Sequence, residues 1–230
     1  MIIAIQQPEH LPWVGFFNKM TLVDEFIYLD NVQFKKRYFE NRNKIRTAKG
    51  WEWCCVPVMT KGSFSQEIKD VQIDYIQNWQ RKYLNKLKSH YGKTKYFAEV
   101  FAGIEGEINK NHPALLGLNI GLITWVRNYL GITTKTALAS QICSGKGSDL
   151  ILGICLKRKA DTYFSGPDGR NYLKSGEFDK AKIALRYHDF THPVYKQKYE
   201  SFISHMSIVD LLFNYGKDAC GIVRELKNDG

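Results

Sequence analysis

Three short polar segments carry the residue types that most readily do chemistry, and each directly follows an apolar run. Residues 7–13 (Gln-Pro-Glu-His-Leu-Pro-Trp) follow the apolar residues 2–5. Residues 30–34 follow a second apolar run, and residues 165–169 (Ser-Gly-Pro-Asp-Gly) follow a third. Apolar runs of this length are typical of buried strands, and ligands bind beyond the carboxyl ends of parallel strands. We therefore expect the three loops to converge on one site.

His10 is the strongest candidate for acid–base catalysis, because an imidazole accepts and returns a proton near neutral pH. Asp30 or Gln33, which follow the second strand, would orient His10 or hold a ligand hydroxyl. Plainer roles stay open: His10 can merely hydrogen-bond its own loop, and Asp30 can cap a turn or a helix. The catalytic interpretation predicts His10, Asp30 and Gln33 as the reacting set.

The loop at residues 165–169 has the composition of an anion-binding turn. Its glycines, Gly166 and Gly169, let backbone N–H groups approach an anion closely, and Arg170 stands beside them to pair with phosphate. Residues 145–148 (Gly-Lys-Gly-Ser) lack the glycine order of a Walker A loop, and no G-x-G-x-x-G follows a strand. These absences argue against a P-loop ATPase and a dinucleotide-dependent dehydrogenase.

Cysteine and histidine offer two further chemistries, a nucleophile and a metal site. Cys155 with His192 or His205 and Asp210 would form a triad for acyl transfer, although its place on the apolar face of a predicted helix favours a buried thiol. His188, His192 and His205 are too widely spaced to predict a zinc site, so we expect no metal. The five cysteines contain no C-x-x-C pair, which favours a reducing, cytoplasmic location.

The chain is basic, with 33 Lys and Arg against 23 Asp and Glu and a net charge of +10. Such a charge predicts an anionic partner. Residues 35–49 concentrate basic side chains, among them Lys36 and Arg37, and interleave them with aromatic ones. This segment fits an anion-binding loop, a solvated surface or a nucleic-acid surface with stacking side chains. No RRM, KH, zinc-finger or helix-turn-helix signature accompanies it, so nucleic acid is the less favoured partner.

The elements that must position these residues read as one α/β domain over residues 1–230, with a helical middle segment at about 78–130. Residues 1–30 have the order strand, loop, helix, strand, which predicts a mostly parallel or mixed Rossmann-like sheet. Other strands are predicted at 45–58 (a hairpin), 66–73, 133–139, 161–164 and 183–187, and other helices at 148–158 and 206–215. No apolar run reaches the ~18–20 residues of a membrane span, and the first residues lack the pattern of a signal peptide.

The motifs together resemble those of the WbqC-like protein family, and the similarity spans nearly the whole chain. The similarity rests on residues 7–17, Asp30-x-x-Gln33-Phe34, residues 41–45, residues 165–173, His192-Pro193-x-Tyr195-x-Gln197 and Ser207-x-x-Asp210-Leu211-Leu212-x-Asn214. A fainter similarity, of a strand followed by a Pro-rich His loop and a helix, is to nucleotidyltransferases of the HUP class. The second histidine of their H-x-G-H motif is absent here, so that similarity implies only a HUP-like form of the sheet.

The resemblance implies a role in bacterial surface-polysaccharide biosynthesis, since members of the family are typically encoded in O-antigen (lipopolysaccharide) clusters that make modified amino sugars. It implies an N-acyl or N-aminoacyl transferase that acts on a nucleotide-linked amino sugar, and the residue chemistry above adds His10 as the general base. Its motifs imply as site residues Gln7, His10, Trp13, Asp30, Gln33, Arg42, Asn43, Ser165, Gly166, Tyr172, Tyr195 and Gln197. The residue chemistry above adds Lys36, Arg37 and Gly169 to the substrate-binding set.

We expect no tightly bound cofactor, and an acyl or aminoacyl donor that is acyl-CoA, a carrier protein or aminoacyl-tRNA. The basic segment 35–49 would hold the diphosphate of a nucleotide sugar or an acidic acyl-carrier protein. Two other classes of function stay open: a nucleic-acid-binding protein, and a non-catalytic subunit that docks onto a polysaccharide enzyme. The sequence leaves the oligomeric state open.

Overall fold

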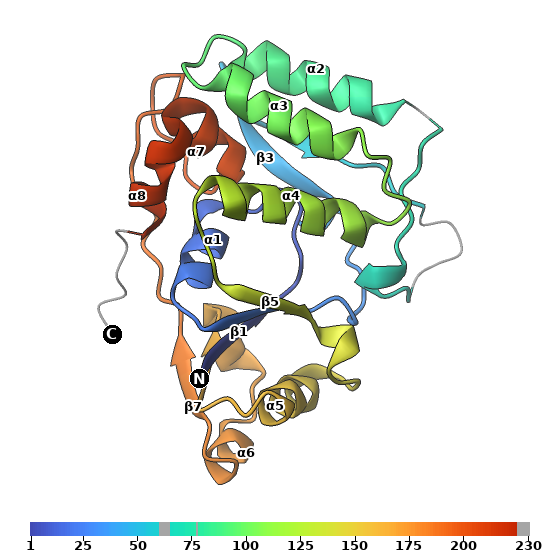
Figure 1. Ribbon diagram of the computed structural model, residues 1–230, viewed down its shortest axis with the longest axis vertical. Coiled ribbons are helices and arrows are strands. Elements are labelled where there is room, and N and C mark those ends of the chain that lie inside the picture. Colours follow the sequence, from blue (N-terminus) through green and yellow to red (C-terminus); the bar gives the residue numbers. More distant parts are fainter. Residues whose placement is uncertain (60–64, 77, 225–230) are drawn as a thin grey trace.

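The computed structural model describes residues 1–59, 65–76 and 78–224 of the chain. At its centre, five strands pair in parallel in the order β5-β2-β1-β6-β7 (Figure 1). The strands are β1 (Ile2–Gln6), β2 (Glu25–Tyr28), β5 (Lys135–Leu138), β6 (Thr162–Ser165) and β7 (Ala184–Tyr187). The structure thereby confirms the predicted Rossmann-like α/β class.

Helices cover both faces of the sheet (Figure 1). On one face lie α1 (Val14–Thr21) and α4 (Leu115–Tyr129), and on the other lie α5 (Gly147–Lys157) and α6 (Ser175–Lys180). Beyond α4 come two outer helices and an antiparallel hairpin, and near α1 two C-terminal helices. These elements are α2 (Trp79–Tyr91), α3 (Phe97–Ile108), β3 (Arg42–Thr47), β4 (Gly50–Cys55), α7 (Ile208–Tyr215) and α8 (Ala219–Arg224).

The side chains of β1 explain why the sheet is buried on both faces. Ile3 and Ile5 pack with Leu150 of α5, whereas Ala4 between them packs with Phe17 of α1 on the opposite face. Because successive side chains of a strand point to opposite faces, a strand covered on both sides needs an unbroken apolar run. Residues 2–5 provide that run.

The connections of the sheet create a crevice at one place. From β1 the chain moves outward through β2 to β5 with α1 on one face, and from β6 it moves the other way to β7 with α6 on the opposite face. The order of the strands therefore reverses between β1 and β6. Ligands of open α/β sheets bind at such a switch point, outside the carboxyl ends of the strands.

The structure differs from the sequence-based prediction in a few elements. The strand predicted at 66–73 is wrong: the segment contains a short 3₁₀ helix, Ile68–Asp70, and single β-bridges to separate partners, so that no ladder forms. The short helices α6 and α8, of six residues each, were not predicted. The extent of a single domain over residues 1–230 stays a prediction, because residues 60–64, 77 and 225–230 lie outside the description.

Asn119, a fully buried residue of α4, holds the loop that follows β1. Its Nδ2 donates to the carbonyl oxygens of Pro8, at 3.0 Å, and Glu40, at 2.7 Å. Its Oδ1 is therefore left to accept from Nδ1 of His10 at 3.0 Å, and the Nε2 of the same ring lies 2.8 Å from the hydroxyl of Tyr83. These bonds draw His10 into the helical layer and fix the path of the loop.

Replacing Asn119 with Ala is expected to lower the free energy of unfolding by about 3 kcal/mol, because it leaves one donor and two acceptors buried without partners. Urea denaturation followed by circular dichroism measures this change. Asn128→Ala, at an exposed position of the same helix, is the matched control and should change stability by less than about 0.5 kcal/mol. Equal effects of the two substitutions would contradict a structural role for Asn119.

Candidate active site

A cavity of about 640 Å³ lies at the switch point of the sheet. It is lined by the end of β1 and the loop after it, by α1, by the first turns of α5, by residues in the segment 35–39, and by the loop at residues 165–169. All three polar loops predicted to converge thus contribute to this cavity, the third through Val32. We call this cavity the switch-point pocket.

Lys19, on the buried side of α1, places an ammonium group in the switch-point pocket although the residue is only 2% exposed. Among the described residues, its Nζ has a single hydrogen bond, to Oε1 of Gln6 at 3.3 Å. A Cβ added at Gly166 would stand 3.9 Å from this Nζ, at ordinary van der Waals distance, so the loop after β6 passes beside the ammonium. Burial lowers the pKa of Lys19 to about 8, against the opposing effect of Glu9. Lys19 is thus a donor with unused capacity for an anionic or carbonyl oxygen.

Glu9 is the acidic neighbour of Lys19 in the same pocket. Burial and the negative charge of Glu40 raise the pKa of the Glu9 carboxyl to about 7, while a hydrogen bond from Gln6 and the charge of Lys19 act in the opposite direction. A carboxyl group with a pKa near neutrality can both take and return a proton at physiological pH. Glu9 therefore has the electrostatic properties that the sequence had suggested for His10.

His188 follows β7 and contributes a hydrogen-bond acceptor. The Nδ2 of Asn18 donates to the carbonyl oxygen of Val223 at 2.8 Å, which turns the Oδ1 of Asn18 toward Nε2 of His188 at 2.8 Å. The proton of the neutral imidazole must then sit on Nε2. Burial and the charge of Lys19 lower the pKa of His188 to about 4, so the ring is neutral at pH 7. Among the described residues, its Nδ1 has no hydrogen-bond partner, and the residue lines the switch-point pocket.

Aromatic side chains form part of the wall of the pocket. The ring of Trp13 lies over Gly15, where an added Cβ would come within 2.4 Å of it, so this packing requires glycine. The same ring stacks on His205, with centroids 5.0 Å apart. Tyr38 and Phe39 contribute a second aromatic pair from the segment after β2. Flat faces of this kind can stack on a nucleobase.

The loop after β6 is packed tightly against the strand. A Cβ at Gly169 would stand 2.1 Å from the hydroxyl oxygen of Ser165, so only glycine allows this turn to close over the strand end. Arg170 does not line the pocket; its guanidinium pairs with Asp189 at 2.9 Å and stacks on Tyr187. The predicted pairing of Arg170 with a phosphate in this site therefore has no geometric support.

Six of the residues predicted as a site from sequence line the switch-point pocket. These are Gln7, Trp13, Ser165, Gly166, Gly169 and Tyr172. The other predicted site residues are found elsewhere. They are His10, Asp30, Gln33, Lys36, Arg37, Arg42, Asn43, Tyr195 and Gln197.

The structure does not place His10 where a general base must be. The residue is 0% exposed, both ring nitrogens are hydrogen-bonded, to Asn119 and Tyr83, and burial lowers its pKa to about 4. A base must reach the proton that it removes. The geometry supports the plainer alternative, in which His10 anchors its loop.

Asp30 and Gln33 also have structural partners. Asp30 accepts hydrogen bonds from the backbone N–H of Ser140 at 2.8 Å and from its hydroxyl at 2.6 Å, which is the capping role left open above. Gln33 forms an isolated β-bridge with Glu67. The third predicted loop therefore fastens the segment after β2 and does not enter the pocket through these two side chains.

Three more of the predicted residues, all outside the switch-point pocket, make hydrogen bonds that support the fold. Asn43 is buried and donates to the carbonyl oxygen of Leu11 at 3.0 Å. Tyr195 and Gln197 each donate to Oδ2 of the buried Asp210 at 2.9 Å. These contacts explain their place in the motifs without a role in binding.

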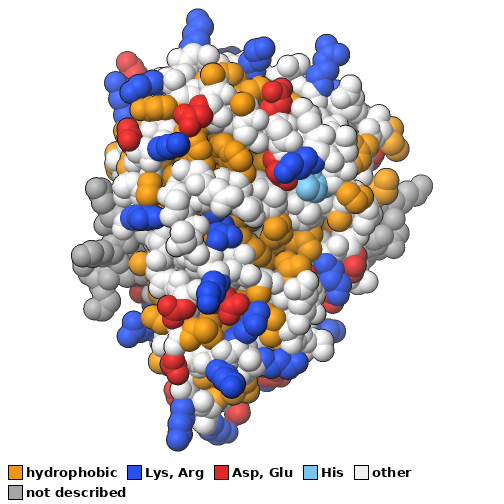
Figure 2. All heavy atoms as spheres, viewed as in Figure 1, with side chains coloured by type: hydrophobic (Ala, Val, Ile, Leu, Met, Phe, Trp, Pro, Cys, Tyr) orange, Lys and Arg blue, Asp and Glu red, His pale blue; other side chains and the backbone are white. Residues whose placement is uncertain are grey.

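The basic segment 35–49 is divided by the structure. Arg46 is buried and donates to backbone carbonyl oxygens, among them that of Gly50. Arg42 stacks on Trp53 with its Cζ 3.9 Å from the ring centroid, while Lys36 and Arg37 are exposed outside the pocket. Figure 2 shows the Lys and Arg side chains of one face scattered among acidic and uncharged ones. The positive charge on this face thus does not gather into one stripe.

The alternative nucleophile and metal find no support either. Cys155 is 0% exposed, burial raises its pKa to about 12, and it packs in the core on the α5 side of the sheet, apart from Asp210 of α7. Among the residues that the structure describes, no group of three or more His, Cys, Asp and Glu side chains could hold a metal ion. In the same residues, no helix is both long and apolar enough to cross a membrane.

Sequence reasoning missed Glu9, Lys19 and His188. Lys19 gave a usable signal: it lies in a short helix of mostly apolar residues directly after the first loop, where a lysine has to be buried. Lysine is almost never fully buried unless it is paired, so its position marks a site. Glu9 stands inside the first motif, but nothing in the sequence shows which side chain of the loop faces the cavity.

The charges around Glu9 predict how its titration responds to substitution. We expect a pKa near 7 for Glu9, a higher value in Lys19→Met, which removes a positive charge, and a lower value in Glu40→Gln, which removes a negative one. Carbon-13 NMR of labelled glutamate, assigned with Glu9→Gln, measures the three values. A wild-type pKa near the ordinary 4.5 would contradict this description of the pocket.

The comparisons with known proteins agree with the motifs. The family model of the WbqC-like protein family matches residues 7–222. The chain is also 34% identical over 226 residues to the uncharacterized protein Rv1507c of Mycobacterium tuberculosis, an alignment that covers 96% of this chain and 97% of that protein. No solved structure matches this chain. With both the family model and this relative matching almost from end to end, the chain belongs to the WbqC-like protein family.

Proposed function

We propose that the protein is an N-acyl or N-aminoacyl transferase that acts on the amine of a nucleotide-linked amino sugar in bacterial surface-polysaccharide biosynthesis. The observation that carries the proposal is the pair of Glu9 and Lys19, a proton acceptor and a cationic donor that line the same pocket. Groups with opposite tasks and strongly shifted pKa values in a cleft are typical of active sites. The family resemblance supplies the class of substrate.

In the proposed reaction, the sugar amine attacks the carbonyl carbon of a thioester or ester donor. The new C–N bond forms, the C–S or C–O bond of the donor breaks, and the thiol or alcohol leaves with a proton. Glu9 takes the proton that the amine loses on attack and returns it to the leaving group, so it replaces His10 as the general base of the proposal. A positioned base typically contributes about a hundredfold or more to such a rate.

Lys19 and His188 have complementary tasks in this mechanism. The ammonium of Lys19 donates to the carbonyl oxygen on which negative charge develops, a contribution that a site screened from water strengthens. The Nδ1 of His188 accepts a hydrogen bond from the amine and directs its lone pair toward the carbonyl carbon. Both groups are held in position by neighbours, Lys19 by Gln6 and His188 by Asn18.

The nucleotide portion of the substrate would lie toward the aromatic wall. Tyr38 offers a face for the base, and Lys35 with the backbone N–H groups of Gly166 and Asp168 offers donors for the diphosphate. The donor stays open among acyl-CoA, an acidic acyl-carrier protein and aminoacyl-tRNA, and the proposal needs no tightly bound cofactor. A cytoplasmic location, where nucleotide sugars are made, belongs to the same proposal.

Calorimetric titration with a UDP-linked and a dTDP-linked amino-dideoxyhexose, followed by turnover with acetyl-CoA and with charged tRNA, tests the proposal. We expect binding of one nucleotide sugar and a product heavier by one acyl or aminoacyl group in mass spectrometry. Glu9→Gln should retain binding but slow turnover by about a hundredfold or more. Lys19→Met should weaken both.

Lys49→Met is the matched control for Lys19→Met, because Lys49 is an exposed lysine that lies outside the pocket. It should leave binding and turnover unchanged. Full turnover in Glu9→Gln would remove Glu9 from the mechanism. Failure of both nucleotide sugars to bind, with protein shown to be folded by circular dichroism, would overturn the proposed substrate class.

A further inference from the structure

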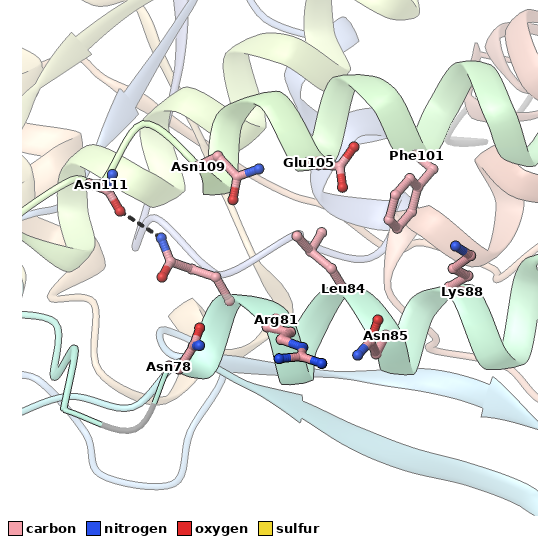
Figure 3. Close-up of a pocket in the computed structure, with 10 residues that line it drawn as sticks. Asn78, Arg81, Leu84, Asn85, Lys88, Phe101, Glu105, Asn109 and Asn111 are labelled. Atoms are coloured by element: carbon pink, nitrogen blue, oxygen red, sulfur yellow. Dashed lines mark hydrogen bonds between the residues drawn. The ribbon is translucent and has the colours of Figure 1, made fainter.

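A second cavity, of about 440 Å³, lies between the outer helices α2 and α3. Figure 3 shows side chains from the two helices facing one another across it. Because α2 and α3 stack beyond α4, away from the sheet, the cavity is separate from the switch-point pocket (Figure 1). We call it the amide groove, since half of its ten lining residues are Asn or Gln: Asn78, Gln80, Asn85, Asn109 and Asn111.

Most of the polar side chains in the amide groove are exposed and make no hydrogen bond to another described residue. Gln80 donates to Oδ1 of Asn111 at 2.7 Å, which fixes one end of the groove. Among the described residues, the side-chain amides of Asn78, Asn85 and Asn109 have no hydrogen-bond partner. Each of these amides can donate and accept at once. The groove thus presents paired donors and acceptors at several points along its length.

The charged side chains of the groove nearly balance. Arg81 and Lys88 come from α2 and Glu105 comes from α3. Among the described residues, none of the three is engaged in an ion pair, although opposite charges face the same cavity. Their guanidinium and carboxylate groups therefore stay available as further bidentate hydrogen-bonding groups. A net charge of one positive unit is too small to select a polyanion.

The apolar part of the groove is small and central. Leu84, 8% exposed, and Phe101 are its apolar lining residues (Figure 3). Two apolar side chains do not form the stripe that an amphipathic helix requires, and they are too few for a lipid chain. The helical walls also offer no free strand edge to which an extended peptide could add. The surface suits a ligand with many hydroxyl groups and a small apolar face.

We propose that the amide groove binds a neutral saccharide. Hydroxyl groups donate and accept at the same atom, which matches the side-chain amides, and the C–H face of a sugar ring would lie on Leu84 and Phe101. The groove is thus a binding site for a glycan chain, distinct from the site of the proposed transfer reaction. The inference does not depend on the proposed function, because its residues and its ligand class are argued from the groove alone.

NMR titration of the side-chain NH₂ signals tests the inference, with maltotriose, chitotriose and a rhamnose trisaccharide as probes at millimolar concentrations. We expect saturable shifts of the Asn85 and Asn109 signals with at least one probe. The double substitution Arg81→Ala with Asn85→Ala, at exposed positions that the helix tolerates, should raise the dissociation constant by about tenfold or more. Lys19→Met should leave it unchanged.

Two results would overturn the inference. One is the absence of any shift with all three saccharides, and the other is binding that the double variant does not weaken. The nucleotide-sugar titration described above separates the two proposals, since the double variant keeps an intact switch-point pocket. Binding of nucleotide sugar without binding of any trisaccharide would contradict only the proposed saccharide site in the amide groove. Binding of a trisaccharide without binding of nucleotide sugar would contradict only the proposed transferase function.

Discussion

The hydrogen bonds of Asn119 are the interaction on which both the fold and the pocket depend. They join the N-terminal half of α4 to Pro8, His10 and Glu40, three points on two loops that are far apart in the sequence. Because His10 is drawn toward α4, the neighbouring Glu9 is left on the side of the switch-point pocket. A buried polar network whose members are all satisfied fixes one arrangement, whereas a half-satisfied network is costly. The position of the candidate base is thus set by a residue that does not touch the pocket.

Lys19 and Glu9 also show how the pocket holds two charged groups whose burial would otherwise favour their neutral forms. Each group alone would lose its hydration on burial and become neutral. Together each opposes the shift of the other: the charge of Lys19 lowers the pKa of Glu9, and that of Glu9 raises the pKa of Lys19. The two pKa values end near neutrality from opposite directions.

The parts of this structure that follow from hydrophobic pattern were accessible from the sequence. The unbroken apolar run at residues 2–5 gave a strand buried on both faces, and the sheet rule then brought the loops after β1 and β6 together. The direction of single side chains within a loop was not accessible. His10 and Glu9 are adjacent in the chain, and what separates their roles is the long-range contact with Asn119, 109 residues away from His10.

The sequence likewise does not show which of the basic side chains face the pocket. Residues 35–49 form one basic segment in the sequence, but its second half is the strand β3, whose alternate side chains point to different surroundings. Arg46 donates to backbone carbonyl oxygens and Arg42 stacks on a tryptophan ring, so that Lys35 is the basic side chain of the segment that lines the pocket. Net charge describes how a protein attracts its partners, while the site is decided by which few charges lack a structural partner. In this pocket that charge is Lys19, which stands outside the basic segment altogether.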